Sequence, residues 1–292
     1  MRMVIGIQIS SLEAYLTTPQ AVDDTLRRLK DMGCSHVQLQ WIAPSVPNAA
    51  AGDALRAHGL VSLGVQEKFD AAIQALDRLI DLNRCSGSTE LCLSGIPERF
   101  QGTIGARDFA LALEGVRARL EKDGQTLSYH PLWKDFRPAE DGRPMAEIVL
   151  DALPDLTLVP DTCQLIRAGL DAGAWIERHA GHISMVHFKD MLSPDPASKL
   201  APVGQGCTDF PRITAACLRA NVPYALVEQE TWDRDAFECI KEGFDYAREL
   251  LYRGRHPKQT LVCFSENTDQ SLFCLAGQTG TSQNRPRFVF CN

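Results

Sequence analysis

Residues 185–190 have the sequence Met-Val-His-Phe-Lys-Asp. Apolar side chains lead into a histidine, a lysine and an aspartate, as expected at the carboxyl end of a buried strand in an α/β barrel. Residues 156–161, Leu-Thr-Leu-Val-Pro-Asp, and residues 224–228, Tyr-Ala-Leu-Val-Glu, follow the same order. Three segments that each end in an ionisable side chain predict parallel strands that share one polar rim.

Short apolar runs of this kind recur along the chain, and segments with helical periodicity separate them. The expected strands are Val4–Gln8, His36–Gln40, Leu60–Gly64, Glu90–Ser94, Thr126–His130, Leu156–Pro160, Ile183–Phe188 and Tyr224–Glu228. Helices cover both faces of a parallel sheet, which explains the continuous apolar runs. The eight runs, the polar strand ends and the lack of Gly-x-Gly-x-x-Gly after the first run favour a (β/α)8 TIM barrel over a doubly wound sheet.

Helix boundaries follow from capping residues and from apolar periodicity. Thr18 is the expected N-cap before Pro19, and Gly33 is expected to end that helix in a left-handed conformation. One buried stripe is expected from Phe69, Ile73, Leu76 and Ile80. The clearest stripe belongs to the last barrel helix, with Phe237, Ile240, Phe244, Ala247 and Leu251.

Residues 254–292 differ in character from the rest of the chain. They are rich in Gln, Asn, Ser, Thr and Gly and have no helical period. A disordered tail, a strand-forming appendage and an oligomer contact all fit this composition. We therefore expect one α/β barrel domain over residues 1–253 with an atypical C-terminal tail, and formation of a homo-oligomer stays open.

The composition excludes several classes of protein. Of 292 residues, 45% are apolar and 23% are charged, as in soluble globular proteins. A net charge of −7 without a basic stripe argues against nucleic acid as a partner. No apolar run reaches the ~20 residues that cross a membrane. Ten scattered cysteines without a CxxC pair, and no secretory signal pattern, predict reduced thiols and a cytoplasmic protein.

Polar residues at four consecutive strand ends are the candidates for chemistry. They are His130 after the fifth expected strand, Asp161 after the sixth, His187 and Lys189 at the seventh, and Glu228 at the eighth. A closed barrel brings these ends together, so imidazoles and carboxylates would converge there. This donor set suits one divalent metal ion, such as Mn, Mg, Co or Zn.

Three motifs, in this order, resemble the xylose isomerase-like barrel superfamily of sugar phosphate isomerases and epimerases. They are Val-His-Phe-Lys-Asp at 186–190, Val-Gly-Gln-Gly at 203–206 and Val-Glu at 227–228. The resemblance covers about residues 5–253 and implies that Asp161, His187 and Glu228 bind the metal. Well-known members carry a glutamate at the end of strand five, where this chain has His130. The fourth ligand is therefore His130, Asp135 or water.

The resemblance also implies a mechanism and a substrate class. The metal would polarise a carbonyl of a small polyhydroxy substrate, and proton transfer next to that metal-bound carbonyl would proceed through an enediolate. Glu228 is the implied general base, and His130 and Lys189 would move protons or bind oxyanions. The residues expected to contact the substrate are Trp133, Gln164, Gly204 and Gly206. Isomerisation or epimerisation of a sugar or sugar phosphate is favoured.

Three alternatives remain from the sequence. An inosose-type dehydratase would use the same scaffold and eliminate water. A barrel endonuclease with three zinc ions would need many histidines at strand ends, whereas this chain has seven in all and an acidic balance. A non-catalytic sugar-binding barrel is kept open by Leu132, which stands where a subgroup of the family has a second histidine, and by the missing strand-five glutamate.

Overall fold

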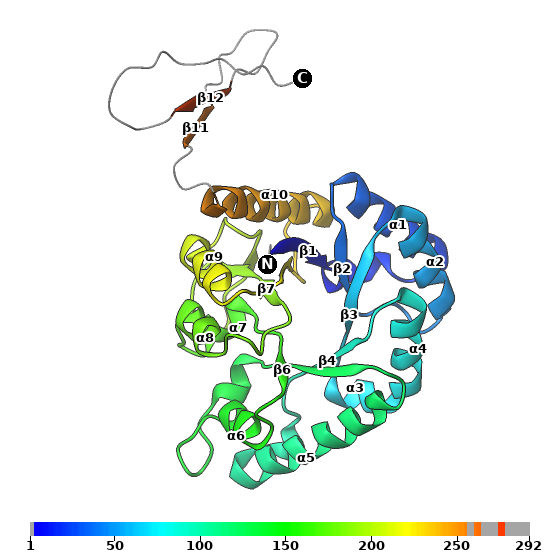
Figure 1. Ribbon diagram of the computed structural model, residues 1–292, viewed down its shortest axis with the longest axis vertical. Helices are drawn as coiled ribbons and strands as arrows, with labels where there is room; N and C mark the ends of the chain where they lie inside the picture. Colours follow the sequence, from blue (N-terminus) through cyan, green and yellow to red (C-terminus); the bar gives the residue numbers. More distant parts are fainter. Residues whose placement is uncertain (1–2, 256–259, 264–273, 278–292) are drawn as a thin grey trace.

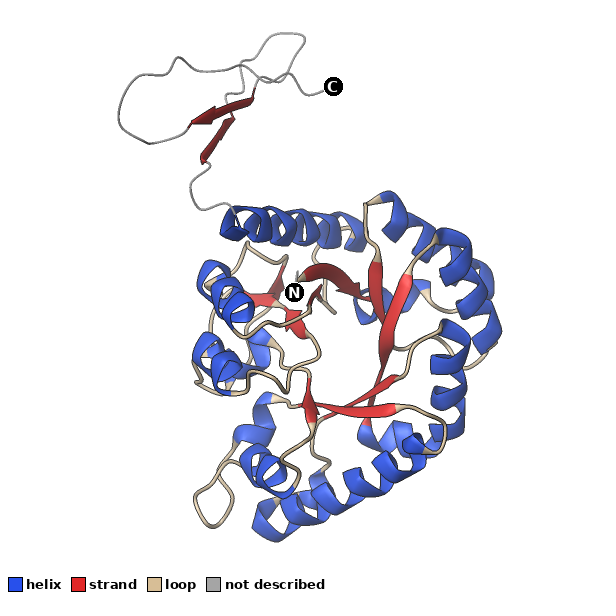
Figure 2. Ribbon diagram, viewed as in Figure 1, coloured by secondary structure: helices blue, strands red, loops and turns tan. Residues whose placement is uncertain are grey.

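The structure, a computed structural model, describes residues 3–255, 260–263 and 274–277. Eight parallel strands curl into a barrel, and helices surround it on the outside (Figures 1 and 2). This architecture confirms the predicted α/β TIM barrel. The barrel strands are β1 (Val4–Gln8), β2 (His36–Leu39), β3 (Val61–Lys68), β4 (Glu90–Ser94), β5 (Thr126–His130), β6 (Thr157–Leu158), β7 (Val186–Phe188) and β10 (Tyr224–Val227).

The strands follow the order β6-β5-β4-β3-β2-β1-β10-β7. The seam between β6 and β7 is closed by two isolated parallel bridges, which pair Leu158 with Ile183 and Asp161 with His187. The amide of His187 donates to the carbonyl of Pro160 at 2.8 Å. Two of the candidate metal ligands therefore face each other across the seam of the barrel.

Strand boundaries match the sequence expectation in part. β1, β4 and β5 have the predicted ends, whereas β3 continues past Gly64 because Glu67 and Lys68 still pair with β4. β6 is reduced to Thr157–Leu158. The predicted end of that strand is Pro160, which has no backbone N–H to donate to a ladder.

Helices cover the outer face of the strands (Figure 2). The α-helices are α1 (Pro19–Asp31), α2 (Asn48–His58), α3 (Phe69–Gln74), α4 (Leu76–Ser86), α5 (Gly102–Glu121), α6 (Met145–Ala152), α7 (Thr162–Arg167), α8 (Ala172–Arg178), α9 (Phe210–Arg219) and α10 (Ala236–Arg255). Short 3-10 helices are η1 (Ile9–Tyr15), η2 (Glu98–Phe100) and η3 (Trp133–Phe136). No helix among the described residues is long and apolar enough to span a bilayer.

The capping predictions for α1 are confirmed. The Thr18 side chain accepts a hydrogen bond from the amide of Ala21, and Gly33 has φ +85°. The apolar stripe of α10 is also confirmed, since all five of its predicted residues are buried.

The single helix predicted from Phe69 to Ile80 is wrong. The backbone leaves the helical region at Ala75, which separates α3 from α4, and Ile73 is 46% exposed. The reason lies in β3, which runs on to Lys68, so that α3 begins directly at the strand end. The chain therefore has to turn again before α4 packs along the barrel, and the two halves of the expected stripe belong to different helices.

An aromatic cluster packs α5 against α3 and β5. The ring of Phe109 lies 5.1 Å from Phe69, 5.6 Å from Phe100 and 5.9 Å from Tyr129, measured between ring centroids. Phe109 and Tyr129 are fully buried. The Tyr129 hydroxyl donates to Asp135 Oδ2 at 2.7 Å, which connects this part of the core to the loop that follows β5.

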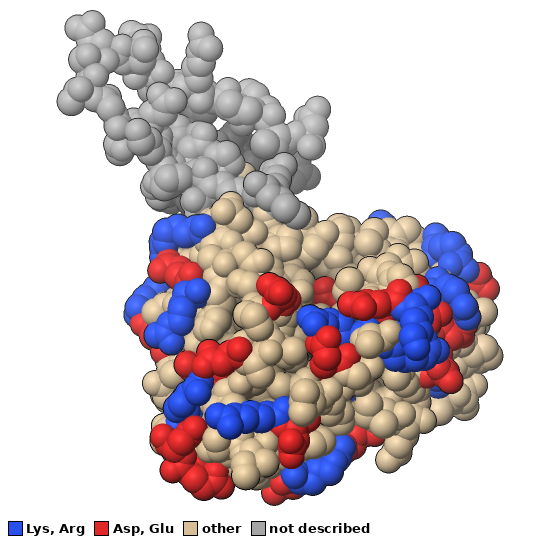
Figure 3. All heavy atoms as spheres, turned by 60° about the horizontal axis from the view of Figure 1, so that its bottom comes forward, with Lys and Arg blue, Asp and Glu red and all other residues tan. Residues whose placement is uncertain are grey.

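The described part of the C-terminal segment contains two strands, β11 (Thr260–Cys263) and β12 (Cys274–Gly277), which pair antiparallel. The remainder of 256–292 lies outside the described residues, and the three alternatives for this segment stay predictions. On the barrel face seen in Figure 3, acidic and basic side chains are interspersed. Exposed ion pairs, such as that of Arg143 with Asp151, also occur on the surface of the protein.

Candidate metal centre

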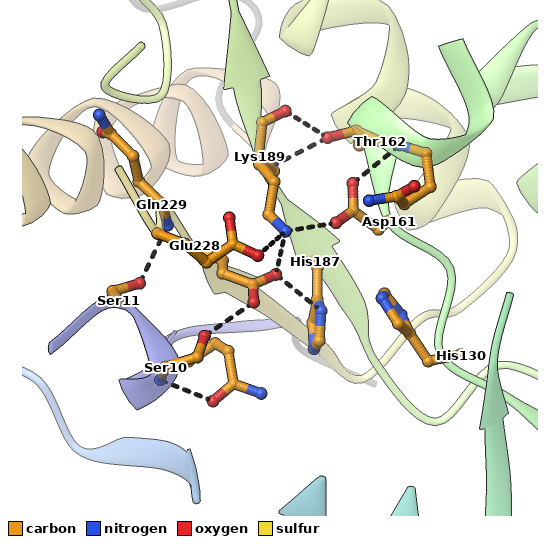
Figure 4. Close-up of polar contacts among 12 residues, drawn as sticks. Ser10, Ser11, His130, Asp161, Thr162, His187, Lys189, Glu228 and Gln229 are labelled. Atoms are coloured by element: carbon orange, nitrogen blue, oxygen red, sulfur yellow. Dashed lines mark hydrogen bonds and ion pairs between the residues drawn. The ribbon is translucent and has the colours of Figure 1, made fainter. Parts of the chain in front are cut away.

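Four candidate ligands meet at the carboxyl ends of consecutive strands. His130 is the last residue of β5, Asp161 precedes α7, His187 lies in β7, and Glu228 follows β10. Their exposed fractions are between 0% and 3%. Figure 4 shows the side chains of Asp161, His187 and Glu228 grouped around Lys189, with His130 beside His187. The barrel thus brings together all four residues that the sequence predicts as metal ligands.

Asp161 acts both as a helix cap and as part of this group. One carboxylate oxygen, Oδ1, accepts the amide hydrogen of Gln164 at 3.0 Å and so caps α7. The other oxygen, Oδ2, lies 2.9 Å from the Lys189 ammonium. The structural role of Asp161 therefore uses one oxygen and leaves the other directed at the site.

The hydrogen bonds of the two histidines define which ring nitrogen carries the proton. His130 Nδ1 lies 2.7 Å from the carbonyl oxygen of Val159, which can only accept, so Nδ1 is the donor. His187 Nε2 lies 2.7 Å from Gln38 Oε1, an oxygen that also accepts from Gln8 Nε2. His187 Nε2 is therefore a donor as well. In the neutral rings, His130 Nε2 and His187 Nδ1 keep their lone pairs for a metal ion.

Burial keeps the His130 ring neutral. Removal from water lowers the pKa of His130 from 6.5 to about 4. The two rings lie 4.9 Å apart between centroids. A neutral imidazole is the form that ligates metals, so His130 is in the required state at neutral pH.

The donor set fits a divalent cation. One ligand atom from each of His130, Asp161 and His187 lies within 4.8 Å of the others, and all three side chains are buried. Glu228 Oε2 lies 3.0 Å from His187 Nδ1. Two unprotonated acceptors at this separation repel each other, so a proton or a cation has to be shared between them. Two imidazoles with carboxylates suit Zn, Mn or Co.

Lys189 supplies a positive charge to the same place. Its Nζ lies 2.9 Å from Asp161 Oδ2, 3.0 Å from Glu228 Oε2 and 2.7 Å from Glu230 Oε1. Burial opposes the charged form of Lys189, but the three carboxylates raise its pKa well above the usual value. Burial likewise opposes ionisation of Glu228, but the Lys189 ammonium lowers the pKa of Glu228 well below its usual value.

Several residues that sequence reasoning missed hold this group in position. Ser10 Oγ donates to Glu228 Oε1 at 2.8 Å, and Gln38 fixes the proton of His187. Glu230 binds Lys189 near the surface, and its side chain is 31% exposed. Ser10 and Gln38 stand at or just after the ends of β1 and β2, so the strand-end rule that selected His130 would also have selected them.

Asp135, the alternative fourth ligand, is occupied in the loop after β5. Its carboxylate accepts from the Tyr129 hydroxyl, from the amide of Leu132 at 2.9 Å and from the amide of Ile96 at 3.1 Å. These contacts fit a carboxylate that organises the loop. Of the alternatives from the sequence, His130 is the residue that lies with Asp161 and His187.

The predicted substrate residues have contacts of other kinds. The Trp133 amide donates to Gln164 Oε1 at 3.0 Å, and the Arg137 guanidinium lies 4.6 Å from the Trp133 ring centroid. The amides of Gly204 and Gly206 donate to Asp190 Oδ2 at 2.9 and 2.8 Å. Contact of these residues with a substrate stays a prediction, and the amides of both glycines are already engaged within the protein.

Asp190 organises the loop between β7 and α9. Its Oδ1 accepts from the amides of Met191 and Thr208, while Oδ2 accepts from Gly204 and Gly206. A Cβ atom on Gly206 would lie 2.3 Å from Asp190 Oδ1, which shows how closely the loop wraps the carboxylate. The residue that follows Lys189 in sequence thus fixes the loop beside the site.

Replacement of Asp190 by asparagine is expected to destabilise the protein by about 2 kcal/mol, because the side-chain NH2 would face amide donors that the carboxylate now satisfies. Chemical denaturation monitored by circular dichroism would measure this difference. Asp195→Asn is the matched control, since Asp195 is an exposed residue of the same loop and accepts from the amide of Ala197. Equal stability of the two variants would contradict the assigned role of Asp190.

A cavity of about 270 Å³ opens beside Glu230. It is lined by residues 10–15, Glu230, Trp232 and 234–236. Sites for drug-sized ligands usually have about 300–1,000 Å³, so this cavity suits a smaller molecule. Ser10 and Glu230 connect its wall to Glu228 and Lys189.

The chain matches a known protein family over most of its length. The family model described as xylose isomerase-like TIM barrel matches residues 17–251. A sugar phosphate isomerase/epimerase from Parabacteroides distasonis is similar in structure, with a TM-score of 0.70 and 17% identity over 85% of this chain and 94% of that one. An L-ribulose 3-epimerase has a TM-score of 0.67 and 18% identity over 88% of this chain and 97% of that one.

Another similar structure is a probable 3-DHS dehydratase from Bacillus anthracis. Its TM-score is 0.64, with 11% identity over 85% of this chain and 99% of that one. A search of curated protein sequences finds no match. At identities this low, the TM-scores show that these proteins share the fold of this chain and nothing more.

Proposed function

Because the chain belongs to the xylose isomerase-like TIM barrel family, we propose that it is a divalent-metal-dependent isomerase or epimerase of a sugar or sugar phosphate. The observation that supports this proposal is the buried group of His130, Asp161, His187 and Glu228 at the carboxyl ends of the strands. Similar structures named as a sugar phosphate isomerase/epimerase and an L-ribulose 3-epimerase point to the same class.

A divalent cation held by His130, Asp161, His187 and Glu228 would polarise a substrate carbonyl and acidify the neighbouring C–H bond. Glu228 is the proposed general base. Lys189 keeps its carboxylate ionised, and Ser10 donates a hydrogen bond to its Oε1. The Lys189 ammonium is the proposed partner for negative charge that develops on the substrate oxygen.

Glu230 is a second carboxylate in a position to exchange a proton with the substrate. Burial raises the pKa of Glu230, which makes this carboxylate a stronger base than Glu228. Both glutamates follow β10 and contact the same Lys189 ammonium, which supports the proposal that they face one side of a bound substrate. Removal and return of a proton on one face interconverts an aldose and a ketose, whereas epimerisation needs opposite faces. This arrangement favours isomerisation over epimerisation.

Dehydration on the same scaffold is the second candidate. It needs an acid that protonates the departing hydroxyl, and the Lys189 ammonium beside Glu228 supplies such a donor. The similarity to a structure named as a probable 3-DHS dehydratase supports this candidate. Elimination would share the first proton abstraction with isomerisation and differ in the fate of the adjacent hydroxyl.

Deuterium exchange tests the proposal even when the structure of the product is unknown. The full chain is incubated with Mn²⁺ and a panel of aldoses, ketoses and their phosphates in D2O, followed by mass spectrometry. An isomerase or epimerase places one solvent deuterium on a carbon atom of the sugar, which raises the mass of the sugar by about 1 Da after its hydroxyl groups are exchanged back to hydrogen. A dehydratase instead lowers the mass by about 18 Da through loss of water. Absence of both changes across the panel, with Mn²⁺ bound, would favour a non-catalytic sugar-binding barrel.

A further inference from the structure

The Lys189 ammonium lies where two of the candidate metal ligands converge. Its side chain is 3% exposed, and Nζ contacts Asp161 Oδ2 and Glu228 Oε2 at 2.9 and 3.0 Å (Figure 4). The remaining oxygen of each carboxylate is engaged elsewhere, since Asp161 Oδ1 caps α7 and Glu228 Oε1 accepts from Ser10. The two oxygens left for a cation are therefore the two that hold the ammonium.

A divalent cation and this ammonium compete for the same space. Metal–oxygen bonds to carboxylates measure about 2.0–2.2 Å, so an ion bound to both Asp161 Oδ2 and Glu228 Oε2 has to lie between them. At that position the cation would lie next to the Lys189 ammonium, and two positive charges this close repel each other strongly in a buried site. The ammonium has an alternative position, because Glu230 Oε1 already holds it at 2.7 Å and the Glu230 side chain is 31% exposed toward the adjoining cavity.

We propose that Lys189 is a built-in competitor for the divalent cation. In the metal-free protein its ammonium bridges Asp161 and Glu228, and on cation binding it withdraws to Glu230. The inference rests on the proposed function, because the cation is the one proposed there. The ammonium neutralises buried carboxylates that would otherwise stand uncompensated, so the barrel folds without metal and metal binding is weakened to a reversible level.

The first test replaces the competitor. Lys189→Met keeps an unbranched side chain of similar length and removes its charge, and isothermal titration calorimetry with Mn²⁺ alone measures binding to the full chain. We expect the variant to bind Mn²⁺ at least about tenfold more tightly, because the cation no longer displaces an ammonium. The metal-free variant should also melt at a lower temperature than the parent protein, and Mn²⁺ should reverse that loss.

The second test separates displacement from simple repulsion. If Glu230 receives the displaced ammonium, Glu230→Gln weakens Mn²⁺ binding while Lys189 is present and has no effect in the Lys189→Met background. If Glu230 acts on the cation directly, Glu230→Gln weakens Mn²⁺ binding equally in both backgrounds. A double-mutant cycle in Mn²⁺ affinity therefore reports the coupling between the two side chains.

Each outcome decides between the inference and the proposed function. Unchanged or weaker Mn²⁺ binding by Lys189→Met, or an equal effect of Glu230→Gln in both backgrounds, overturns the inference and leaves a metal-dependent enzyme standing. Binding by Lys189→Met but not by the parent protein supports the inference and overturns metal dependence. Absence of binding by both proteins overturns both. If Lys189→Met folds only with Mn²⁺ present, this also supports the inference, and the Mn²⁺ concentration needed to fold it, with and without Glu230→Gln, then replaces calorimetry in the cycle.

Discussion

Asp161→Asn is expected to weaken Mn²⁺ binding by more than about 10²-fold, because even loss of a partner that merely orients a metal ligand costs about 10–100-fold. The substitution keeps the size of the side chain, and the amide oxygen can still accept from Gln164 and cap α7. It removes the charge of Oδ2 and places an NH2 group against the Lys189 ammonium. The fold should survive, while deuterium exchange into a substrate should fall with the metal affinity. Calorimetry with Mn²⁺ measures the first effect, and the D2O assay measures the second.

Asp171→Asn is the matched control for this prediction. Asp171 also precedes a helix, and its Oδ1 accepts from the amide of Ala174 at 3.0 Å, as the Oδ1 of Asp161 does from Gln164. Asp171 lies at the surface beside Arg212. The control makes the same substitution at the same kind of helix cap and should leave Mn²⁺ affinity unchanged. Tight Mn²⁺ binding by Asp161→Asn would remove the metal centre from the proposed function.

Phe109→Ala is expected to lower the free energy of unfolding by about 3–5 kcal/mol, the usual cost of deleting a buried phenylalanine. The ring is fully buried and contacts Phe69, Phe100 and Tyr129, so neighbours on three sides would have to collapse into the space. Urea denaturation monitored by circular dichroism measures the change. Below its melting temperature the variant should retain metal binding, since Phe109 contacts none of the ligands.

Leu111→Ala in the same helix is the control for Phe109. Leu111 is 71% exposed, so its replacement should change stability by less than about 0.5 kcal/mol, as surface substitutions usually do. A loss of similar size in both variants would indicate that α5 is sensitive to any substitution. The aromatic cluster would then not be the reason for the instability of Phe109→Ala.

The sequence alone predicts the barrel architecture and the residues that meet at the carboxyl ends of its strands. Parallel strands place their carboxyl ends at one rim, so an apolar run followed by Asp161, His187 or Glu228 indicates proximity without any knowledge of distances. The same logic explains the stripe of α10, because a helix that packs on a barrel repeats its apolar residues every three or four positions. Both features follow from the local order of apolar and polar residues once the chain is known to form a barrel.

Features that depend on the exact placement of side chains were beyond the sequence. The donor state of His187 follows from Gln38, which is 149 residues away in the chain and is itself held by Gln8. The bridge made by Lys189 depends on three carboxylates from two different strand ends. The break at Ala75 depends on how far β3 continues its pairing with β4, which apolar periodicity does not report.

The seam of the barrel has a consequence for how this protein can change. β6 and β7 are the shortest barrel strands, and a bridge between Asp161 and His187 helps to join them. One of the contacts that complete the cylinder therefore also brings two of the ligands together. Insertions or deletions between Leu158 and Asp161 would shift the register of both at once, so architecture and chemistry at this point can only evolve together.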